Sequence, residues 1–437
     1  MKFKLLFALL LFATTVCFPA ARYVISTDSN NNVTTISFTN KFFEGVCTVE
    51  GREGKRWVPL KNFFTTQFIG QVSLTLPTNY AGFRLKCVAV GPGNAFNRLA
   101  QVYGMIHTVA GTGGGPVLTN AWLPEYEGDY ATNVVLSDPR YAMADEDGNI
   151  YVVERAGHAV DKITPDGRIH TFIGTHTPGD SGQLPGQTAT SFPLRSPSAI
   201  YITSGSLFVL DAGNNRIVKV DLEGPAAGVA GIIQYDFTTN GVGAHSAGLW
   251  VEADLDNPQM PTYEAYFGSG TELKHLEDNV VSVAASGFVR ISHVTVDPRG
   301  RIIVSDSADN RVYRARGTGL REPVAGTGLA TGPRKAEDVL DVALPGASSV
   351  WFLPITGYLI SLDQGAKIYY VDSDDQAAPV VFGLPGTHAG DGEWFRKGGK
   401  KPKISNALSV SLAPNGDMII VEGNGYVRKI DFLRRKP

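Results

Sequence analysis

Short strand-like runs of apolar residues, each introduced by a turn, recur along the chain from about residue 96 onward. In every copy a glycine opens the run, apolar residues follow, and an acid stands six residues after the glycine. The six runs are 148–154, 205–211, 248–254, 300–306, 357–363 and 416–422. The run at 248–254 is the least regular, and it fills a long gap between its neighbours. Runs of this length and composition predict β-strands.

Further strands surround each run in a constant order. A first strand precedes the turn, as at 293–297, a third follows the acid, as at 215–221, and a fourth ends in glycine-rich sequence, as at 168–174. Asp-Gly and Asn-Gly pairs at 147–148 and 415–416 supply the positive φ angles that tight hairpins need. Four strands repeated every ~40–60 residues are typical of propeller blades. We therefore expect an all-β protein with a six-bladed β-propeller.

The two ends of the repeat array complement each other. The sixth copy stops after its third strand at 426–431, and a spare fourth strand at 105–111 precedes the first copy. An open ring would leave an unpaired strand edge, which folded proteins avoid. We therefore expect the N-terminal strand to complete the last blade and close the ring.

Several segments of the array resemble NHL-repeat propellers, including teneurin-type and bacterial exported members. The matching segments are 109–113, 149–153, 214–217 and 324–328, with a linker at 179–197. The resemblance covers roughly residues 105–437, and it departs from the family at Ala159, Lys367 and Tyr426, where an arginine is expected in the third strand. It implies a six-bladed propeller that most often serves as a binding scaffold, and it implies no activity.

The N-terminal region has a different pattern. Lys2 and Lys4 precede an apolar run at 5–16 that is too short to span a bilayer, so residues 1–21 are predicted to be a signal peptide. Residues 22–95 carry short alternating runs without helical periodicity, which predicts a small accessory β-sandwich. The propeller then occupies 96–437. The mature protein is expected to be secreted, periplasmic or on the cell surface.

Export affects the interpretation of the cysteines. Once Cys17 is removed with the signal peptide, Cys47 and Cys87 remain, each in a strand-like run. In an oxidising compartment an even pair favours a disulfide, here across the sandwich, which stabilises a small domain by about 2–4 kcal/mol. Two buried free thiols are the alternative.

Composition narrows the class of protein further. Charged residues make up only 19% of the chain, and glycine accounts for 49 of its 437 residues. This composition argues against helical bundles and fits a turn-rich β-protein. A formal net charge of −3 gives no electrostatic basis for nucleic-acid binding. No later stretch of the sequence is predicted to be a transmembrane segment.

The acids that end the second strands are one candidate site. They are Glu154, Asp211, Asp254, Asp306, Asp363 and Glu422. An architectural role is favoured, because every blade has one: each carboxylate would accept backbone N–H groups or pair with an arginine such as Arg216 or Arg311. The alternative is a metal site for Ca²⁺, which prefers oxygen ligands. No other cofactor is expected.

First-strand residues are predicted to face the central channel and form a second candidate site. They are Tyr141, His293 and Ser409, with Arg140 and Arg290 nearby. This set could bind an anion or perform acid–base chemistry, and an ordinary water-filled channel is the alternative.

Two aromatic residues supply a third candidate. Trp122 and Tyr126 lie in the linker before the first full blade and could stack on a sugar or a peptide. A role in packing is the equal alternative.

The functional hypothesis follows from a complete structural repeat that lacks a complete catalytic set. We expect an exported, non-catalytic scaffold that binds a protein segment or a glycan. Its binding face would be built by the linkers 112–137, 175–197, 328–347 and 384–404. The rival hypothesis is a metal-dependent hydrolase or lyase that uses the channel mouth, with His293, Tyr141 and some of the acids.

Overall fold

The computed structural model describes most of the chain, in two compact units, Met1–Ala89 and Val90–Pro437. The described residues are 22–28, 33–39, 45–65, 69–75, 80–89, 99, 102–115, 117–182, 186–223, 228–235, 246–254, 262–278, 280–317, 319–332, 338–353, 357–393 and 403–432. The predicted signal peptide lies outside them. Within the described ranges, none of the helices has the length and apolar character needed to cross a membrane.

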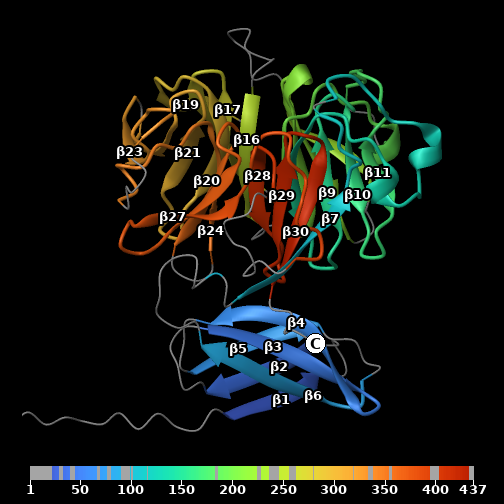
Figure 1. The fold of residues 1–437 in the computed structure, drawn as a ribbon. Helices are drawn as coiled ribbons and strands as arrows, with labels where there is room; N and C mark the ends of the chain where they lie inside the picture. The colour runs from blue at the N-terminus through green and yellow to red at the C-terminus, as the bar shows by residue number, and fades with distance from the viewer. Residues whose placement is uncertain are drawn as a thin grey trace, which may run out of the picture. The chain divides into compact units, whose positions relative to one another are not determined.

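The N-terminal unit consists of two three-stranded sheets (Figure 1). One has the order β1-β2-β5 and the other β4-β3-β6. Their strands are β1 (Arg22–Asp28), β2 (Val33–Thr39), β3 (Gly45–Glu53), β4 (Arg56–Thr65), β5 (Ile69–Thr75) and β6 (Phe83–Ala89). Residues from both sheets, among them Ile36 of β2 and Val49 of β3, form one hydrophobic cluster.

Cys47 and Cys87 form the disulfide that the sequence favoured. The two cysteines are direct partners in the register of β3 and β6, and their Cα atoms lie 4.0 Å apart. The bond therefore joins neighbouring strands of one sheet. The expectation that it would cross between sheets was wrong, because alternation along a strand does not reveal which strands pair.

The C-terminal unit contains six four-stranded antiparallel sheets among its described residues. Sheets 1 to 3 consist of β8 (Pro139–Ala144), β9 (Ile150–Glu154), β10 (Ala159–Ile163) and β11 (Ile169–Gly174); β12 (Ala199–Thr203), β13 (Ser206–Asp211), β14 (Arg216–Asp221) and β15 (Ala230–Tyr235); and β16 (Ser246–Asp254), β17 (Thr262–Ser269), β18 (Glu272–Glu277) and β19 (Val280–Ser286). Sheets 4 to 6 consist of β20 (Ile291–Val296), β21 (Ile302–Asp306), β22 (Arg311–Ala315) and β23 (Arg321–Ala325); β24 (Ala347–Phe352), β25 (Tyr358–Leu362), β26 (Lys367–Val371) and β27 (Ala377–Phe382); and β28 (Ala407–Leu412), β29 (Met418–Glu422), β30 (Tyr426–Phe432) and β7 (Tyr103–Ala110).

The first strands of the six sheets contact one another in a closed cycle. The order is β8, β12, β16, β20, β24, β28 and again β8. Sheets arranged around a common axis with their first strands innermost make a propeller-like fold (Figure 1). Serine hydroxyls link neighbouring first strands: Ser348 Oγ donates to the Ala407 carbonyl over 2.8 Å, and Ser411 Oγ donates to the Ala142 carbonyl over 2.7 Å.

The last sheet combines strands from the two ends of the unit. β7 pairs antiparallel with β30, so that Ile106 lies opposite Ile430. The hydroxyl of Tyr426 donates to the Thr112 carbonyl over 2.7 Å just beyond this pairing. This is the strand pairing that the sequence predicted for its spare N-terminal strand.

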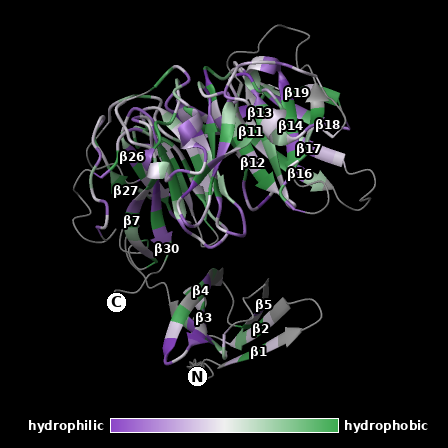
Figure 2. Ribbon diagram, turned by 90° about the vertical axis from the view of Figure 1, so that its right-hand side faces the viewer, coloured by the Kyte–Doolittle hydropathy of each residue, from purple (hydrophilic) through white to green (hydrophobic). Residues whose placement is uncertain are grey.

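Hydrophobic clusters fill the junctions between successive sheets. One cluster joins Val153 of sheet 1 to Val209 of sheet 2, and another joins Phe208 of sheet 2 to Phe267 of sheet 3. Figure 2 shows the hydrophobic residues along strands such as β12 and β14. Strands that are covered on both faces need apolar residues at successive positions. This explains why the second strands are continuous apolar runs in the sequence.

One copy of the repeat was assigned to the wrong strand. The run at 248–254 lies in β16, which is the first strand of sheet 3, and not in a second strand. Gly248 (φ +70°) sits at a bulge, where a Cβ atom would lie 2.5 Å from the backbone nitrogen of Val294 in β20. A glycine required for close approach of two strands thus resembled a turn glycine. Asp254 ends a first strand, and its side chain is not among those described.

Candidate functional site

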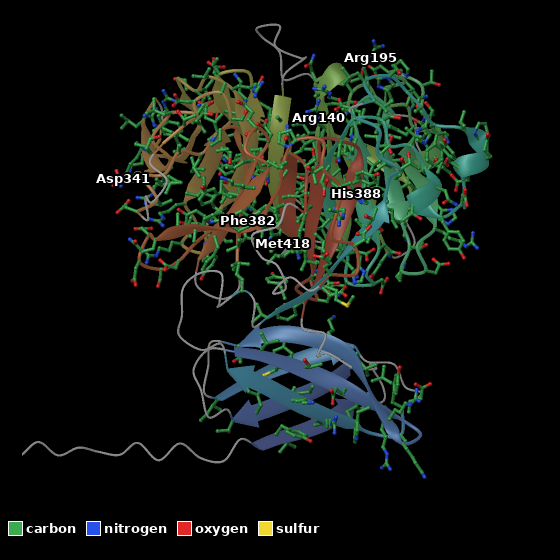
Figure 3. The ribbon with its side chains drawn as sticks, viewed as in Figure 1. Arg140, Arg195, Asp341, Phe382, His388 and Met418 are labelled. Carbon is green, nitrogen blue, oxygen red and sulfur yellow. A yellow bond between two sulfur atoms is a disulfide. The ribbon has the colours of Figure 1, made fainter. Side chains whose placement is uncertain are left out.

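A cavity of about 760 Å³, here called the mouth cavity, opens at the end of the sheets where the second strands finish. Residues from all six sheets, or from the segments that enter them, line it. Figure 3 places Arg140 and Arg195, which line the cavity, toward one end of the sheets and Met418 toward the other.

Bulges in the first strands supply one set of lining residues. In five of these strands the register shifts by one residue at the same level. The residues at the shifts are Arg140, Gly248, Ser292, Ser348 and Leu408, and all five line the cavity. A bulge turns the extra residue out of the ladder, so it is free to face the cavity.

In four sheets the residue after the second strand also lines the cavity. Arg155 follows Glu154 of β9, and Ser307 follows Asp306 of β21. Asp363 belongs to this set as well, as the register of sheet 5 shows. At the start of the first strand, Ile291 of sheet 4 pairs with the strand-end acid Asp306. The equivalent residue of sheet 5, Ala347, pairs with Leu362 and not with Asp363. Leu362 therefore holds the position of the strand-end acid in sheet 5. The interpretation of Asp363 as equivalent to the other acids was wrong by one residue.

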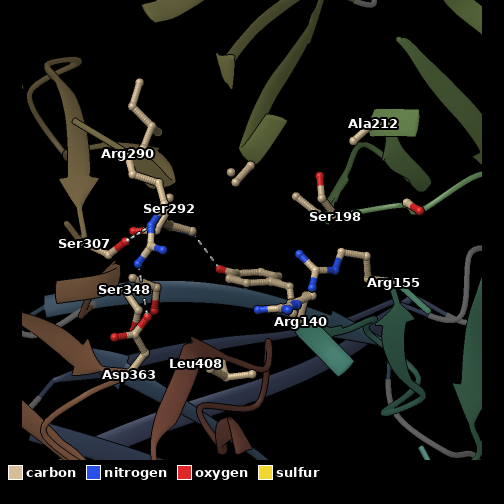
Figure 4. Close-up of a pocket in the computed structure, with 18 of the residues that line it drawn as sticks. Arg140, Arg155, Ser198, Ala212, Arg290, Ser292, Ser307, Ser348, Asp363 and Leu408 are labelled. Carbon is tan, nitrogen blue, oxygen red and sulfur yellow. Dashed lines mark hydrogen bonds and ion pairs between the residues drawn. The ribbon is translucent and has the colours of Figure 1, made fainter. Parts of the chain in front are cut away.

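Arginines stand on two sides of the cavity. Figure 4 shows Arg140 and Arg155 on one side, with Arg290 near Asp363 on the other. Arg140 and Arg155 share the buried carboxylate of Asp138, at 2.8 and 2.6 Å. Arg290 Nε donates to Ser307 Oγ over 3.1 Å. Arginine is always charged and its planar group presents several hydrogen-bond donors, so these two sides of the cavity suit an anion.

Asp363 is the one carboxylate among the described lining residues. Its Oδ2 lies 4.0 Å from a guanidinium nitrogen of Arg290, and its buried Oδ1 has no hydrogen-bond partner among the described residues. Burial raises the pKa of Asp363 to about 6, although the charges of Arg290 and Arg140 lower it. The acid therefore changes charge within the physiological range.

Tyr141 and His293 form the floor of the cavity. Tyr141 Oη lies 3.0 Å from His293 Nε2, and the two rings stack with centroids 5.2 Å apart. The backbone N–H of Val350 donates to His293 Nδ1 over 3.4 Å, so the imidazole carries its proton on Nε2 and donates to Tyr141. Burial lowers the pKa of His293 to about 3 and raises that of Tyr141. Both groups are thus neutral, and the tyrosine hydroxyl keeps its own hydrogen to donate.

The strand-end acids are held separately, each within its own sheet. Each accepts the backbone N–H of a residue that precedes the first strand of that sheet. The donors and distances are Ser137 to Glu154 (2.8 Å), Arg195 to Asp211 (2.7 Å), Val289 to Asp306 (2.7 Å) and Ser405 to Glu422 (3.1 Å). The described residues include no group of three or more His, Cys, Asp and Glu residues placed to hold a metal ion. These four donors precede the first strand, and a further donor lies in the turn after the second strand, where the backbone N–H of Asp309 donates to Asp306 over 3.3 Å.

Two of these acids also form buried ion pairs. Arg216 Nε donates to Asp211 Oδ2 over 2.7 Å, and both side chains are fully buried. Arg428 lies 3.2 Å from Glu422 in the same buried state. Arg311 pairs instead with Asp309 at 3.2 Å.

Sheet 1 replaces the buried arginine with a second acid. Asp161 is the third residue of β10, the position that Arg428 occupies in β30. It is fully buried, and His176 Nε2 lies 3.4 Å from its Oδ1. Burial raises the pKa of Asp161 to about 8, and burial together with Asp161 raises the pKa of Glu154.

The remaining candidates from the sequence lie apart from the mouth cavity. Ser409 is buried and is not a lining residue. Trp122 stacks on His176 with centroids 4.1 Å apart and meets Tyr126 edge-on. Both aromatics pack against the hydrophobic cluster between sheets 1 and 6.

Sequence reasoning overlooked Arg155 and Arg195 as lining residues. Arg155 could have been found, because it directly follows an acid that the repeat had already identified. Arg195 carried no such signal, since it lies in a linker without a repeated pattern.

No family model matches the chain, and no curated protein matches it. Its structure is similar to that of a structural genomics protein of unknown function from Bacteroides thetaiotaomicron, at 11% identity and a TM-score of 0.51, over 92% of this chain and 94% of that one. An auxiliary nutrient binding protein from the same organism matches with 11% identity, a TM-score of 0.51 and coverage of 92% and 94%. These similarities support an all-β, propeller-like fold.

Proposed function

We propose that the protein is an exported, non-catalytic binding protein. In this proposal a six-bladed NHL-type propeller (96–437) holds a glycan or a protein segment on its linker-loop face, and residues 22–95 form an accessory β-sandwich. The observation that carries the proposal is the mouth cavity, which draws lining residues from all six sheets. One structure with a similar fold is named an auxiliary nutrient binding protein, so a binding role is one already named for this fold.

The chemistry of the cavity supports binding over catalysis. His293 and Tyr141, its buried titratable pair, are neutral and hydrogen-bond each other. The strand-end acids accept backbone hydrogen bonds in separate sheets. A metal-dependent hydrolase or lyase would require these groups to converge on one ion.

Direct binding tests the proposal. The purified full chain is screened on glycan and peptide arrays beside Arg140→Gln, with Arg316→Gln at an exposed position outside the cavity as control. Binding that Arg140→Gln weakens at least tenfold, and Arg316→Gln leaves unchanged, supports the proposal. Binding that both variants retain places the ligand elsewhere and contradicts it.

Two further experiments address the linkers and the rival function. Binding is expected to survive removal of 22–95 and to be lost when 112–137 or 175–197 is shortened.

Metal analysis of the purified protein addresses the rival hypothesis of a metal-dependent enzyme. Stoichiometric Ca²⁺ or Zn²⁺, with a hydrolytic or lyase activity that a chelator abolishes, would favour an enzyme.

The disulfide supports the proposed location outside the cytoplasm. Cys47–Cys87 is a bond that persists in oxidising compartments. We propose that the mature protein is secreted, periplasmic or on the cell surface.

A further inference from the structure

We infer that the mouth cavity binds the oxyanion of an acidic sugar between Arg140 and Arg155 on one side and Arg290 on the other. The inference rests on the proposed function and names the ligand class of the same cavity. A sugar carboxylate and a sugar phosphate share the recognised chemistry, an oxyanion on a polyhydroxylated molecule.

The cavity has an excess of positive charge. Its described lining residues include four arginines and a single carboxylate, that of Asp363. Behind the lining, the one carboxylate of Asp138 is shared by Arg140 and Arg155. Two carboxylates therefore face four guanidinium groups. An anion that enters the cavity reduces the repulsion among these groups.

Polar atoms that lack a partner point to where the ligand would bind. The Nε–H of Arg140 is buried and has no hydrogen-bond partner among the described residues. The same holds for Ser198 Oγ, which also lines the cavity. A buried donor without a partner costs about 1–3 kcal/mol, which an accepting oxyanion or hydroxyl would recover.

Arginines on opposite sides suit an oxyanion in particular. Figure 4 shows the side chains of Arg140 and Arg155 across the cavity from that of Arg290. Guanidinium groups recognise carboxylates and phosphates through paired, charge-assisted hydrogen bonds. An oxyanion placed between them would be contacted from both sides.

The rest of the lining favours a sugar over an acidic peptide. Seven of the twenty described lining residues carry a hydroxyl group: Tyr141, Ser196, Ser198, Ser292, Ser307, Ser348 and Ser349. A hydroxyl can both donate and accept, as a polyhydroxylated ligand requires. Ser292 and Ser348 already donate to backbone carbonyls, whereas Ser198 Oγ has no partner among the described residues. Ile291 and Leu408 are the aliphatic side chains larger than alanine in the described lining. Arginine clusters also recognise acidic peptides, so it is the hydroxyl groups and the small aliphatic part of this lining that favour a sugar.

A side groove extends the mouth cavity outward. A second cavity of about 370 Å³, lined by Leu118, Thr119 and Asn120 of the first linker, shares Arg155 and Ser196 with the mouth cavity. The two spaces are therefore adjoining. This arrangement fits an acidic sugar in the mouth cavity with a further sugar unit in the groove.

Calorimetric titration of the full chain with matched sugars tests the inference. The probes are galacturonic acid against galactose, and glucose 6-phosphate against glucose. At least one acidic sugar is expected to bind tenfold or more tightly than its neutral counterpart and to weaken with added salt. The stronger of the two identifies the source of the oxyanion as carboxylate or phosphate.

Variants locate the site within the cavity. Arg290→Gln and Arg155→Gln, on opposite sides, are each expected to weaken the acidic sugar about tenfold or more, and Arg316→Gln to leave it unchanged. Arg155 and Arg290 are half-exposed, so both variants are expected to fold, which thermal unfolding checks.

The outcomes separate the two proposals. Neutral sugars that bind as tightly as acidic ones, with Arg290→Gln unaffected, overturn the acidic-sugar inference and leave the proposed function standing. An acidic peptide that binds more tightly than any sugar and depends on Arg290 also overturns the inference but supports the function. A protein that binds neither sugars nor peptides contradicts both.

Discussion

Tyr141 Oη and His293 Nε2 form a 3.0 Å hydrogen bond between β8 and β20, which lie three steps apart in the cycle of six first strands. The bond therefore joins sheets on opposite sides of the ring through two neutral side chains.

Removal of this bond is expected to destabilise the ring. Tyr141→Phe leaves the Nε2–H of His293 buried without an acceptor, which costs about 1–3 kcal/mol. Urea unfolding measures the loss, and Tyr130→Phe, at a half-exposed side chain, is the control with no change expected. Equal stability of the two variants would show that the bond between the two sheets contributes nothing.

The buried pair in sheet 2 is expected to be sensitive to the loss of one partner. Arg216→Met leaves Asp211 buried beside an apolar side chain, and we expect a loss of about 3–5 kcal/mol in the free energy of unfolding. Arg168→Met removes exposed contacts, with Asp166 and with the Gly128 carbonyl, and should cost far less. Similar losses for the two variants would contradict the buried role of Arg216.

Asp161 is expected to make the protein less stable as the pH rises. Its folded pKa of about 8 exceeds its ordinary value of 3.8, so folding favours the protonated acid, and stability is lost as the pH rises from about 4 to about 8. The charge of Glu127 also favours this proton, while the hydrogen bond with Glu154 opposes it. Asp161→Asn should match the wild type near pH 4.

At pH 8 the same variant should be more stable than the wild type by at least about 1.4 kcal/mol, the equivalent of one pKa unit. The free energy of unfolding at both pH values provides the measurement. Asp166→Asn, at an exposed acid, should follow the wild type at both. A constant difference between Asp161→Asn and the wild type would contradict the raised pKa.

Asp363 is expected to weaken anion binding as the pH rises. Above about pH 6 its carboxylate is ionised, competes for Arg290 and repels the ligand, so the affinity for galacturonic acid should fall by about tenfold between pH 5 and pH 8. Asp363→Asn should bind with nearly the same affinity at both pH values. Asp341→Asn, at an exposed residue, should retain the wild-type pH dependence. A pH dependence that survives in Asp363→Asn would assign it to another group.

Closure of the last sheet is expected to depend on a glycine. Gly111 (φ +93°) has no room for a side chain, because a Cβ atom would lie 2.0 Å from the carbonyl oxygen of Gly425. Gly114 (φ +108°) has a similar backbone, but nothing lies within 4 Å of its Cβ position. Gly111→Ala should therefore lose about 2 kcal/mol or more relative to Gly114→Ala in urea unfolding. Equal losses would mean that backbone strain alone, and not the approach to Gly425, sets the cost.

Local patterns were sufficient to predict much of the fold. Turn glycines, apolar runs and strand-end acids mark second strands directly, and the missing partner of Tyr426–Phe432 led to the pairing of β7 with β30. Bulges could not be predicted from local patterns, because they depend on contacts with a neighbouring strand. Gly248 illustrates the point, since its requirement comes from Val294 in the next sheet.

The site was predictable only in part for the same reason. Arg140 and His293 could be placed near the channel, because their strand and level followed from the repeat. Asp363 was placed wrongly, since a shift of one residue in register decides whether an acid is enclosed within its sheet or faces the cavity. The spacing in the sequence gives the number of residues between a turn and an acid. It does not give the register in which the strand pairs with its neighbour.

The pairing of β7 with β30 also determines when the protein can finish folding. Thr112, two residues beyond β7, accepts a hydrogen bond from Tyr426, which is 314 residues later in the chain. Sheets 1 to 5 are each continuous in sequence and can form as the chain emerges from the ribosome. β7 has no strand partner until almost the whole chain has emerged, so any interruption of synthesis before β30 releases a product with two open edges.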